Sequence, residues 1–239
     1  MKNENYAKSI DLYGDGKGYV EYVEHMGGDL TVVNSARVSF GVEKEKLDDR
    51  DRKLINYLIK HRHTSTLEHN LITFRFHVPL FVRSQHHRHR TWSYNEISRR
   101  YTDVDIKFYE PTAFRTQHKS NRQASNAEEL IDPNLPGHGG IDLTASCVMG
   151  MHHKFSLKLF NDLIEAGVCR EQARGVLPQN MYTEYYGTVN LNNLLKFIEL
   201  RTHDGAQWEI QKVAEACLEI ATDLYPETVG AYRRIRNKE

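Results

Sequence analysis

The alternation of apolar and polar residues from Leu71 to Val78 constrains the fold more than any other feature of this 239-residue sequence. Every second side chain in this segment is apolar, which is the pattern of a β-strand with one buried face. Pro79 closes the strand and suits the first turn of a helix, because its missing N–H group needs no partner there. We therefore expect a strand that leads directly into a helix from Leu80 to about Arg88.

Other segments predict the remaining elements. A second strand is expected from Val20 to Met26, and apolar residues at helical spacing predict helices at residues 49–61, 145–166, 191–200 and 206–224. Strands in the first half and helices in the second indicate an α+β fold rather than a repeating βαβ fold. We expect residues 1–239 to form a single domain, with a mostly antiparallel sheet in the N-terminal half packed by helices and a helical C-terminal half. The polar stretch 121–140 predicts a surface loop, within a surface insertion at residues 119–142.

The composition excludes several classes of protein. Lys and Arg number 32 and so do Asp and Glu, so no overall charge attracts nucleic acid or membranes. No apolar run approaches the roughly 20 residues that span a bilayer, and the polar start of the chain predicts no secretory signal. Cys147, Cys169 and Cys217 are an odd number and widely spaced. This spacing favours a reduced, cytoplasmic chain without disulfides or a cysteine-based zinc site.

A basic segment from Gln85 to Tyr101, QHHRHRTWSYNEISRRY, holds the clearest functional signal. Guanidinium groups form bidentate hydrogen bonds with phosphate, so its arginines suit an anionic ligand. Two other interpretations remain open on composition alone. One is a solvated basic helix, and the other is an RNA-binding module, although such modules need a recurring aromatic platform that this segment lacks.

The order of residues in this segment resembles one family closely. Arg88-His89-Arg90, followed by seven residues and Ser98, is similar to the signature of flavin-dependent thymidylate synthases. Three further blocks resemble the family in order and spacing, at residues 36–40, at 61–69, and from 177–183 on to Asn190, Arg201 and Gln207. The resemblance covers most of the chain, apart from about 119–142 and the two ends.

This resemblance implies the reductive methylation of dUMP to dTMP. Methylenetetrahydrofolate would donate the carbon, FAD would carry the hydride, NADPH would be the reductant, and no protein nucleophile would take part. It also implies a cytoplasmic homotetramer with active sites at subunit interfaces, and no nucleic-acid or membrane partner.

The resemblance also assigns roles to individual residues. Arg201 is the expected catalytic residue, because it takes the position that ionises or polarises the uracil ring at nitrogen 3. The expected cofactor-binding residues are Ser65, Arg88, His89, Arg90, Glu96, Asn190, Asn192, Lys196 and His63, the last near the flavin ring where folate would stack. The expected substrate-binding residues are Gln85, His86, His87, Arg88, Glu96, Ile97, Ser98, Arg99, Arg100, Arg174 and Arg201. Arg99 would act through its backbone, and Arg174 would come from another subunit.

The sequence departs from the family pattern at several places, and Asn192 and Lys196 replace other polar residue types of the family. The family usually has a histidine just before an Ala-Gln pair, where this chain has Gly205, and His203 is the candidate to replace it. The family often has a proline before the aromatic residue of its histidine-rich block, where Thr66 and Leu67 stand.

Cysteines and histidines raise two alternatives. Thiolate-dependent thymidylate synthases need a cysteine nucleophile, but none of the three cysteines lies in a similar context, and Cys217 is expected to pack in the core. The pairs His61/His63 and His87/His89 could suggest a metal site. They lack the spacing and the carboxylate of a helical zinc site, so no metal is predicted.

Overall fold

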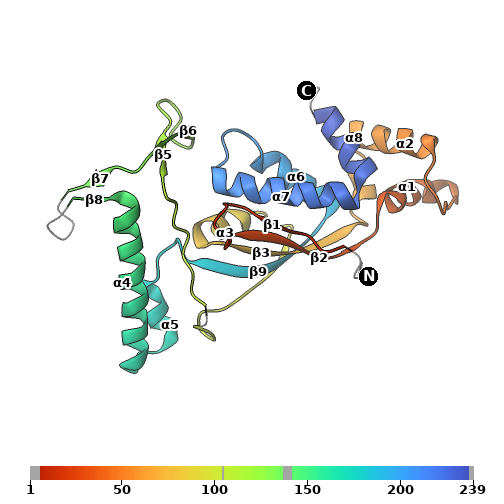
Figure 1. Cartoon of the computed structure of the whole chain (residues 1–239). Helices are drawn as coiled ribbons and strands as arrows, with labels where there is room; N and C mark the ends of the chain where they lie inside the picture. The colour runs from red at the N-terminus through yellow and green to blue at the C-terminus, as the bar shows by residue number, and fades with distance from the viewer. Residues whose placement is uncertain (1–5, 104, 137–141, 237–239) are drawn as a thin grey trace.

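The computed structural model of the chain describes residues 6–103, 105–136 and 142–236. A five-stranded antiparallel sheet forms its centre, in the order β1-β2-β3-β9-β4 (Figure 1). The strands are β1 (Ser9–Asp11), β2 (Tyr19–Met26), β3 (Leu71–Pro79), β9 (Tyr182–Asn190) and β4 (Ser93–Glu96). The α+β class and the mostly antiparallel sheet are thus confirmed.

Strand β3 holds the sheet together and matches its sequence pattern. Its alternate apolar side chains are buried, from Ile72 at 1% exposure to Phe74 and Phe76 at 0%. It pairs with β2 on one side and with β9 on the other, where Phe76 lies opposite Tyr185. Pro79 precedes helix α3 (Leu80–His86), which ends two residues before the expected limit.

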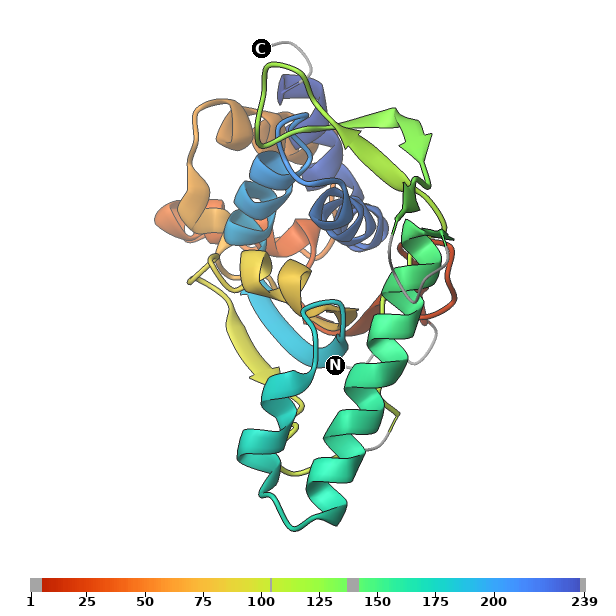
Figure 2. The ribbon, with the colours of Figure 1, turned by 90° about the vertical axis from the view of Figure 1, so that its left-hand side faces the viewer.

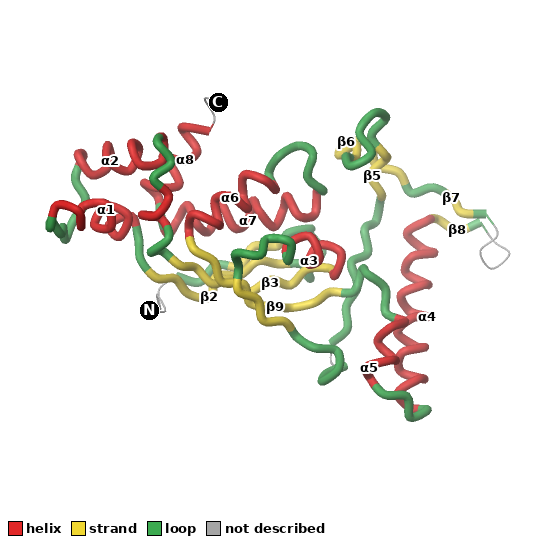
Figure 3. Tube along the Cα trace, turned by 180° about the vertical axis from the view of Figure 1, so that it is seen from behind, coloured by secondary structure: helices red, strands yellow, loops and turns green. Residues whose placement is uncertain are grey.

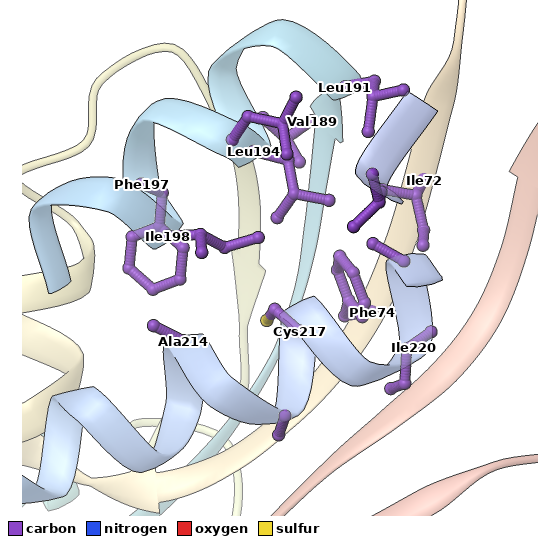
Figure 4. Packing of buried hydrophobic residues seen from close by; sticks show 14 of the residues in the cluster. Ile72, Phe74, Val189, Leu191, Leu194, Phe197, Ile198, Ala214, Cys217 and Ile220 are labelled. Atoms are coloured by element: carbon purple, nitrogen blue, oxygen red, sulfur yellow. The ribbon is translucent and has the colours of Figure 1, made fainter. Parts of the chain in front are cut away.

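Helices cover one face of this sheet. Helices α6 (Leu191–Arg201) and α7 (Trp208–Leu224) lie along it, and three others group at one end (Figures 1 and 3). These three are α1 (Asp29–Arg37), α2 (Asp49–Lys60) and α8 (Pro226–Arg236). Figure 4 shows the core between sheet and helices, where Phe74, Phe197 and Cys217 pack together with 0% exposure. Burying each large apolar side chain contributes roughly 1.5–3 kcal/mol.

A second group of elements projects to the side of the sheet (Figure 2). It contains helices α4 (Ala145–Glu165) and α5 (Arg170–Ala173), and the short strand pairs β5 (Phe114–Gln117) with β6 (Ser125–Ile131) and β7 (Asn134–Leu135) with β8 (Leu143–Thr144). A smaller apolar cluster around Phe108, Phe160 and Met181 joins this part to the sheet.

The polar stretch expected to be a loop contains strands β6 and β7. Most of its described residues are exposed, whereas residues 137–141 lie outside the described part of the chain. That residues 119–142 are an insertion stays a prediction. No helix within the described ranges is both long and apolar enough to cross a membrane.

Candidate active site

Arg201 lies at the end of α6 and is held against the turn that follows α3. Its Nε donates a hydrogen bond to Nε2 of His89 at 3.0 Å, and its Nη2 donates to the backbone oxygen of Gln85 at 3.4 Å. Burial lowers the pKa of the Arg201 guanidinium from its usual value. An arginine nevertheless stays protonated in proteins, so the structure provides a fixed, half-buried positive charge.

His89 is the neutral partner of that charge. Burial, and then the nearby charge of Arg201, lower the pKa of His89 from 6.5 to about 4. Because Nε2 accepts the hydrogen bond from Arg201, the proton of the neutral ring is on Nδ1. The pair therefore carries one positive charge, which is located on the arginine.

The depressed pKa of His89 predicts that stability depends on pH. The folded state disfavours the imidazolium, so the contribution of His89 to stability is complete above about pH 6.5 and is lost as the pH falls toward about 4. Glutamine at this position can still accept a hydrogen bond but does not titrate. In urea unfolding of the flavin-free protein, His89→Gln should therefore lose less stability over this range than the wild type. The exposed His152→Gln serves as control, and an identical pH dependence in all three proteins would contradict the assignment.

A chain of side-chain hydrogen bonds fixes the orientation of Gln85. Glu209, which is 4% exposed, accepts from Nε2 of Gln207 at 2.9 Å and from Nη2 of Arg115 at 2.6 Å. Oε1 of Gln207 in turn accepts from Nε2 of Gln85. A carboxylate can only accept hydrogen bonds, so the amide nitrogen of Gln207 faces Glu209 and its oxygen faces Gln85. Gln85 donates through its own amide nitrogen, which leaves its Oε1 free to accept from a ligand. The sequence predicted neither Glu209 nor Arg115 as part of this arrangement.

Other predicted substrate residues line a separate hollow of about 520 Å³ on the opposite side of α3. Leu80 and Arg83 of α3 face this hollow, together with residues from the segment after β4 and from the turn after α5. The predicted members are Glu96, Ile97, Ser98, Arg99 and Arg174. Arg174 was expected to join Ser98 from another subunit, yet it shares this hollow with Ser98 of its own chain.

The charged side chains around this hollow differ in whether they have a partner within the chain. Glu96 accepts hydrogen bonds from Nε of Arg83 at 2.8 Å and from Thr183 Oγ1 at 2.7 Å, so its carboxylate is engaged within the chain. Arg174 is exposed and forms no ion pair within the described ranges. Arg100 lies outside this hollow and only 3.4 Å from Glu171, a contact of the kind that contributes little at the surface. Arg174 is therefore the cation best placed for a phosphate.

Two predicted substrate-binding residues, His86 and His87, pack against tyrosine side chains of the same chain. His86 is fully buried, and its Nδ1 is hydrogen-bonded to the Tyr185 hydroxyl at 2.8 Å. Its ring therefore packs in the core of this chain, and a role of His86 in substrate binding stays a prediction. His87 stacks on Tyr94 at 4.1 Å between ring centroids, and burial lowers its pKa.

The predicted cofactor residues fall into two further groups. Arg88 and Arg90 are exposed on the turn after α3, and no acidic group pairs with them within the described residues. His63, Asn192 and Lys196 line a hollow of about 300 Å³ between α2, α6 and α8, which we call the α2–α6–α8 hollow.

Two more predicted cofactor residues lie outside both groups. Asn190 caps α6, since its Oδ1 accepts from the Asn193 N–H at 2.9 Å. Ser65 lies exposed in the short 3₁₀ helix Thr64–Leu67. Both are placed at the surface end of α6 and its neighbouring turn, where a ligand can reach them.

His203 and the candidate metal ligands can be located in the structure. His203 is exposed, and its Nδ1 accepts from the Gly205 N–H at 3.0 Å, so its ring stabilises the turn between α6 and α7. Within the part of the chain that the structure describes, no three His, Cys, Asp or Glu side chains gather in a way that could hold a metal ion.

Comparisons with known proteins identify the family. The family model described as thymidylate synthase complementing protein matches residues 21–227. A flavin-dependent thymidylate synthase of Thermus thermophilus is 43% identical over 218 residues, covering 90% of this chain and 76% of the relative. One of Thermotoga neapolitana is 38% identical over 219 residues, covering 90% and 91%.

A solved structure agrees with these relatives. The UMP/dUMP methylase PolB from Streptomyces cacaoi, bound with 5-Br dUMP, superimposes with a TM-score of 0.75 at 34% identity, covering 90% of this chain and 94% of that one. Matches of this identity and coverage, together with the family model, make the assignment plain. The chain belongs to the family of flavin-dependent thymidylate synthases.

Proposed function

We propose that this protein methylates dUMP to dTMP, with methylenetetrahydrofolate as carbon donor, FAD as cofactor and NADPH as reductant. The observation that carries the proposal is the fixed charge of Arg201, held by His89 and by the backbone of Gln85 in the segment that resembles the family signature. The names of the relatives and the dUMP analogue bound to the PolB methylase support the same reaction.

The described residues fit a flavin dinucleotide. Arg88 and Arg90 are exposed cations without acidic partners in the described ranges, which suits a diphosphate. Asn190 and Ser65 offer polar groups at the other end of α6 and in the short 3₁₀ helix before β3, and Lys196 and His63 line the α2–α6–α8 hollow. When bound, the flavin supplies hydride transfer.

Arg201 provides the electrostatic part of catalysis. A cation fixed beside the uracil ring stabilises negative charge on the ring when nitrogen 3 is polarised or ionised, and this charge makes carbon 5 nucleophilic enough to attack an electrophile. Because this charge activates the ring directly, no protein nucleophile is required. Burial raises the pKa of the Cys217 thiol well above its usual value, so that thiol is not available as a thiolate.

The nucleotide site is proposed to form between two copies of the chain. Gln85 and Arg201 lie on one side of α3, and Ser98, Arg99 and Arg174 line the hollow on the other. In a homotetramer, one copy would supply the first group and a neighbour the second. On α4, Phe155 is 65% exposed and Met151 51% exposed, and such an apolar surface supports packing between copies.

The hydrogen-bond chain to Glu209 makes a testable contribution to dUMP binding. Gln207→Leu removes the acceptor for Gln85 Nε2 and leaves the Gln85 amide free to turn. The KM for dUMP should rise about threefold to tenfold, the effect of roughly one neutral hydrogen bond, while bound flavin is unchanged. Gln123→Leu, on the exposed turn between β5 and β6, should behave like the wild type. A KM for dUMP that stays constant in Gln207→Leu would show that the chain does not position Gln85.

The visible spectrum tests the proposed function most simply. The purified protein, reconstituted with FAD if needed, should absorb at about 450 nm, the usual flavoprotein band, and should bleach under anaerobic NADPH. Protein that stays colourless after incubation with FAD would rule out this function.

A further inference from the structure

Arg83 and Glu96 form an ion pair in the wall of the hollow that also contains Ser98 and Arg174. Arg83 comes from α3 and Glu96 from the end of β4, so two separate elements of the fold meet at this pair. The two side chains are 33% and 18% exposed, so the pair is partly shielded from water and still faces the hollow. The resemblance to the family assigns a role to Glu96 but none to Arg83.

The carboxylate of Glu96 keeps one acceptor position free. Its Oε2 accepts from Nε of Arg83 at 2.8 Å and also from Nη2 of the same residue, and its Oε1 accepts from Thr183 Oγ1 at 2.7 Å. A carboxylate offers about four acceptor positions on its two oxygens. Three of them are used within the chain, and Oε1 can accept one further hydrogen bond. Because Thr183 is buried in β9, the carboxylate cannot turn away without leaving a buried hydroxyl unpaired.

The guanidinium of Arg83 keeps a donor free. Its Nε and Nη2 both donate to Glu96, and in the described ranges no acceptor is bonded to its Nη1. A guanidinium is planar and its donors have fixed directions, so the bonds to Glu96 also fix the orientation of Nη1. The pair therefore offers a free donor next to a free acceptor, and its two charges compensate each other.

A hydroxyl group is the ligand that this combination suits. A hydroxyl can donate one hydrogen bond and accept another, whereas a phosphate mostly accepts and would be repelled by the carboxylate. The exposed Arg174 in the same hollow is the better partner for a phosphate. A nucleoside 5′-monophosphate carries both groups on one sugar, the phosphate at the 5′ carbon and a hydroxyl at the 3′ carbon.

We propose that Arg83 is a further substrate-binding residue, and that Arg83 and Glu96 together bind the 3′-hydroxyl of dUMP. The hydroxyl donates to Oε1 of Glu96 and accepts from Nη1 of Arg83. The proposal rests on the proposed function, which makes dUMP the substrate. A nucleotide without this hydroxyl leaves both groups unpaired, so the site discriminates against it.

The ribityl chain of the flavin is the other source of hydroxyl groups, since Glu96 was also expected among the cofactor-binding residues. The composition of the hollow favours the nucleotide. Ser98 and Arg174, which were expected at the nucleotide, line the hollow together with the pair. Arg88 and Arg90, which were expected at the flavin, are not among its lining residues.

A comparison of dUMP with 2′,3′-dideoxyuridine monophosphate tests this proposal. In calorimetric titrations of the flavin-loaded protein, the wild type should bind the dideoxy analogue about tenfold to a hundredfold more weakly than dUMP, because a hydrogen bond to a charged group is lost. In Arg83→Met this ratio should fall to about threefold or less, since the donor is removed and Glu96 loses its anchor. Arg83→Lys, which keeps a charged donor, should recover part of the ratio. Arg52→Met removes an arginine of α2 that is likewise paired with carboxylates, and it should keep the ratio of the wild type.

The ratio of affinities separates a binding role from a structural one. Both nucleotides are titrated into the same preparation, so a loss of folded protein lowers the number of sites but not the ratio. An unchanged ratio in Arg83→Met, or a wild type that binds both nucleotides equally, would overturn the assignment. Weaker flavin binding in Arg83→Met beside an unchanged nucleotide ratio would overturn it in favour of the ribityl chain. Wild-type protein that discriminates as expected but forms no dTMP would contradict the proposed function and leave this assignment standing.

Discussion

The Arg201→Ala variant is expected to form dTMP about two orders of magnitude more slowly than the wild type. The loss should be comparable to removing a donor from an oxyanion hole, because the negative charge on the activated uracil ring loses its fixed partner. Flavin should stay bound, because Arg201 contacts only His89 among the predicted cofactor residues and the exposed Arg88 and Arg90 are left unchanged. Arg201→Lys, which keeps a charge but not the fork of donors, should recover part of the activity.

A cysteine-free protein is the control for this mechanism. Cys147 and Cys169 are exposed near α4 and α5, and Cys217 is buried between α7 and the sheet. Changing all three to Ala should leave most of the turnover intact, with some loss of stability from the small cavity at Cys217. An inactive but folded cysteine-free protein beside an active Arg201→Ala would instead identify a thiol nucleophile.

The Arg174→Ala variant should bind dUMP about tenfold to a hundredfold more weakly, with its flavin in place. Arg174 is exposed in the hollow that it shares with Ser98 and Arg99, and a charge-assisted contact with phosphate contributes roughly 1.5–3 kcal/mol. Arg122→Ala, on the exposed turn between β5 and β6, should leave the affinity unchanged. Arg100→Ala should have a smaller effect than Arg174→Ala, because Arg100 lies outside the hollow. Titration with dUMP that gives the same affinity for Arg174→Ala and wild type would contradict this placement.

The sequence predicted those elements whose apolar pattern is strong. Strand β3 alternates over its whole length, and α6 and α7 repeat apolar residues at helical spacing, so all three lie where expected. Strand β9 was missed although it pairs with β3 along its length. Its inward positions include Thr183 and Gly187 as well as Tyr185, so polarity does not alternate clearly.

Helices α1 and α8 were missed for a related reason. Both are short and rich in polar residues, and contacts between distant parts of the chain stabilise them. The carboxylate of Asp29 in α1 accepts from the N–H groups of Glu227 and Thr228, both at 2.9 Å, and so caps the start of α8. Asp29 and Thr228 are about two hundred positions apart in the chain, and no local sequence pattern connects them.

The sequence yields candidate site residues but not their arrangement. The resemblance predicts Gln85, Ser98 and Arg174 together as substrate-binding residues. The structure puts Gln85 on one side of α3 and the other two on the opposite side. The sequence did not predict Glu209 as a site residue, because an acidic residue in the first turn of a helix ordinarily stabilises the helix dipole. Only its burial and its bonds to Gln207 and Arg115 show that it orients Gln207 and, through Gln207, the side chain of Gln85.

A single turnover tests the central claim most directly. The bound flavin is reduced anaerobically, excess reductant is removed, and dUMP and methylenetetrahydrofolate are added together. Wild-type and cysteine-free proteins should each form dTMP in amounts equal to the flavin absorbance recovered at about 450 nm, and Arg201→Ala should form almost none on the same timescale. Formation of dTMP without recovery of flavin absorbance, or its loss in the cysteine-free protein alone, would contradict flavin-dependent methylation without a protein nucleophile.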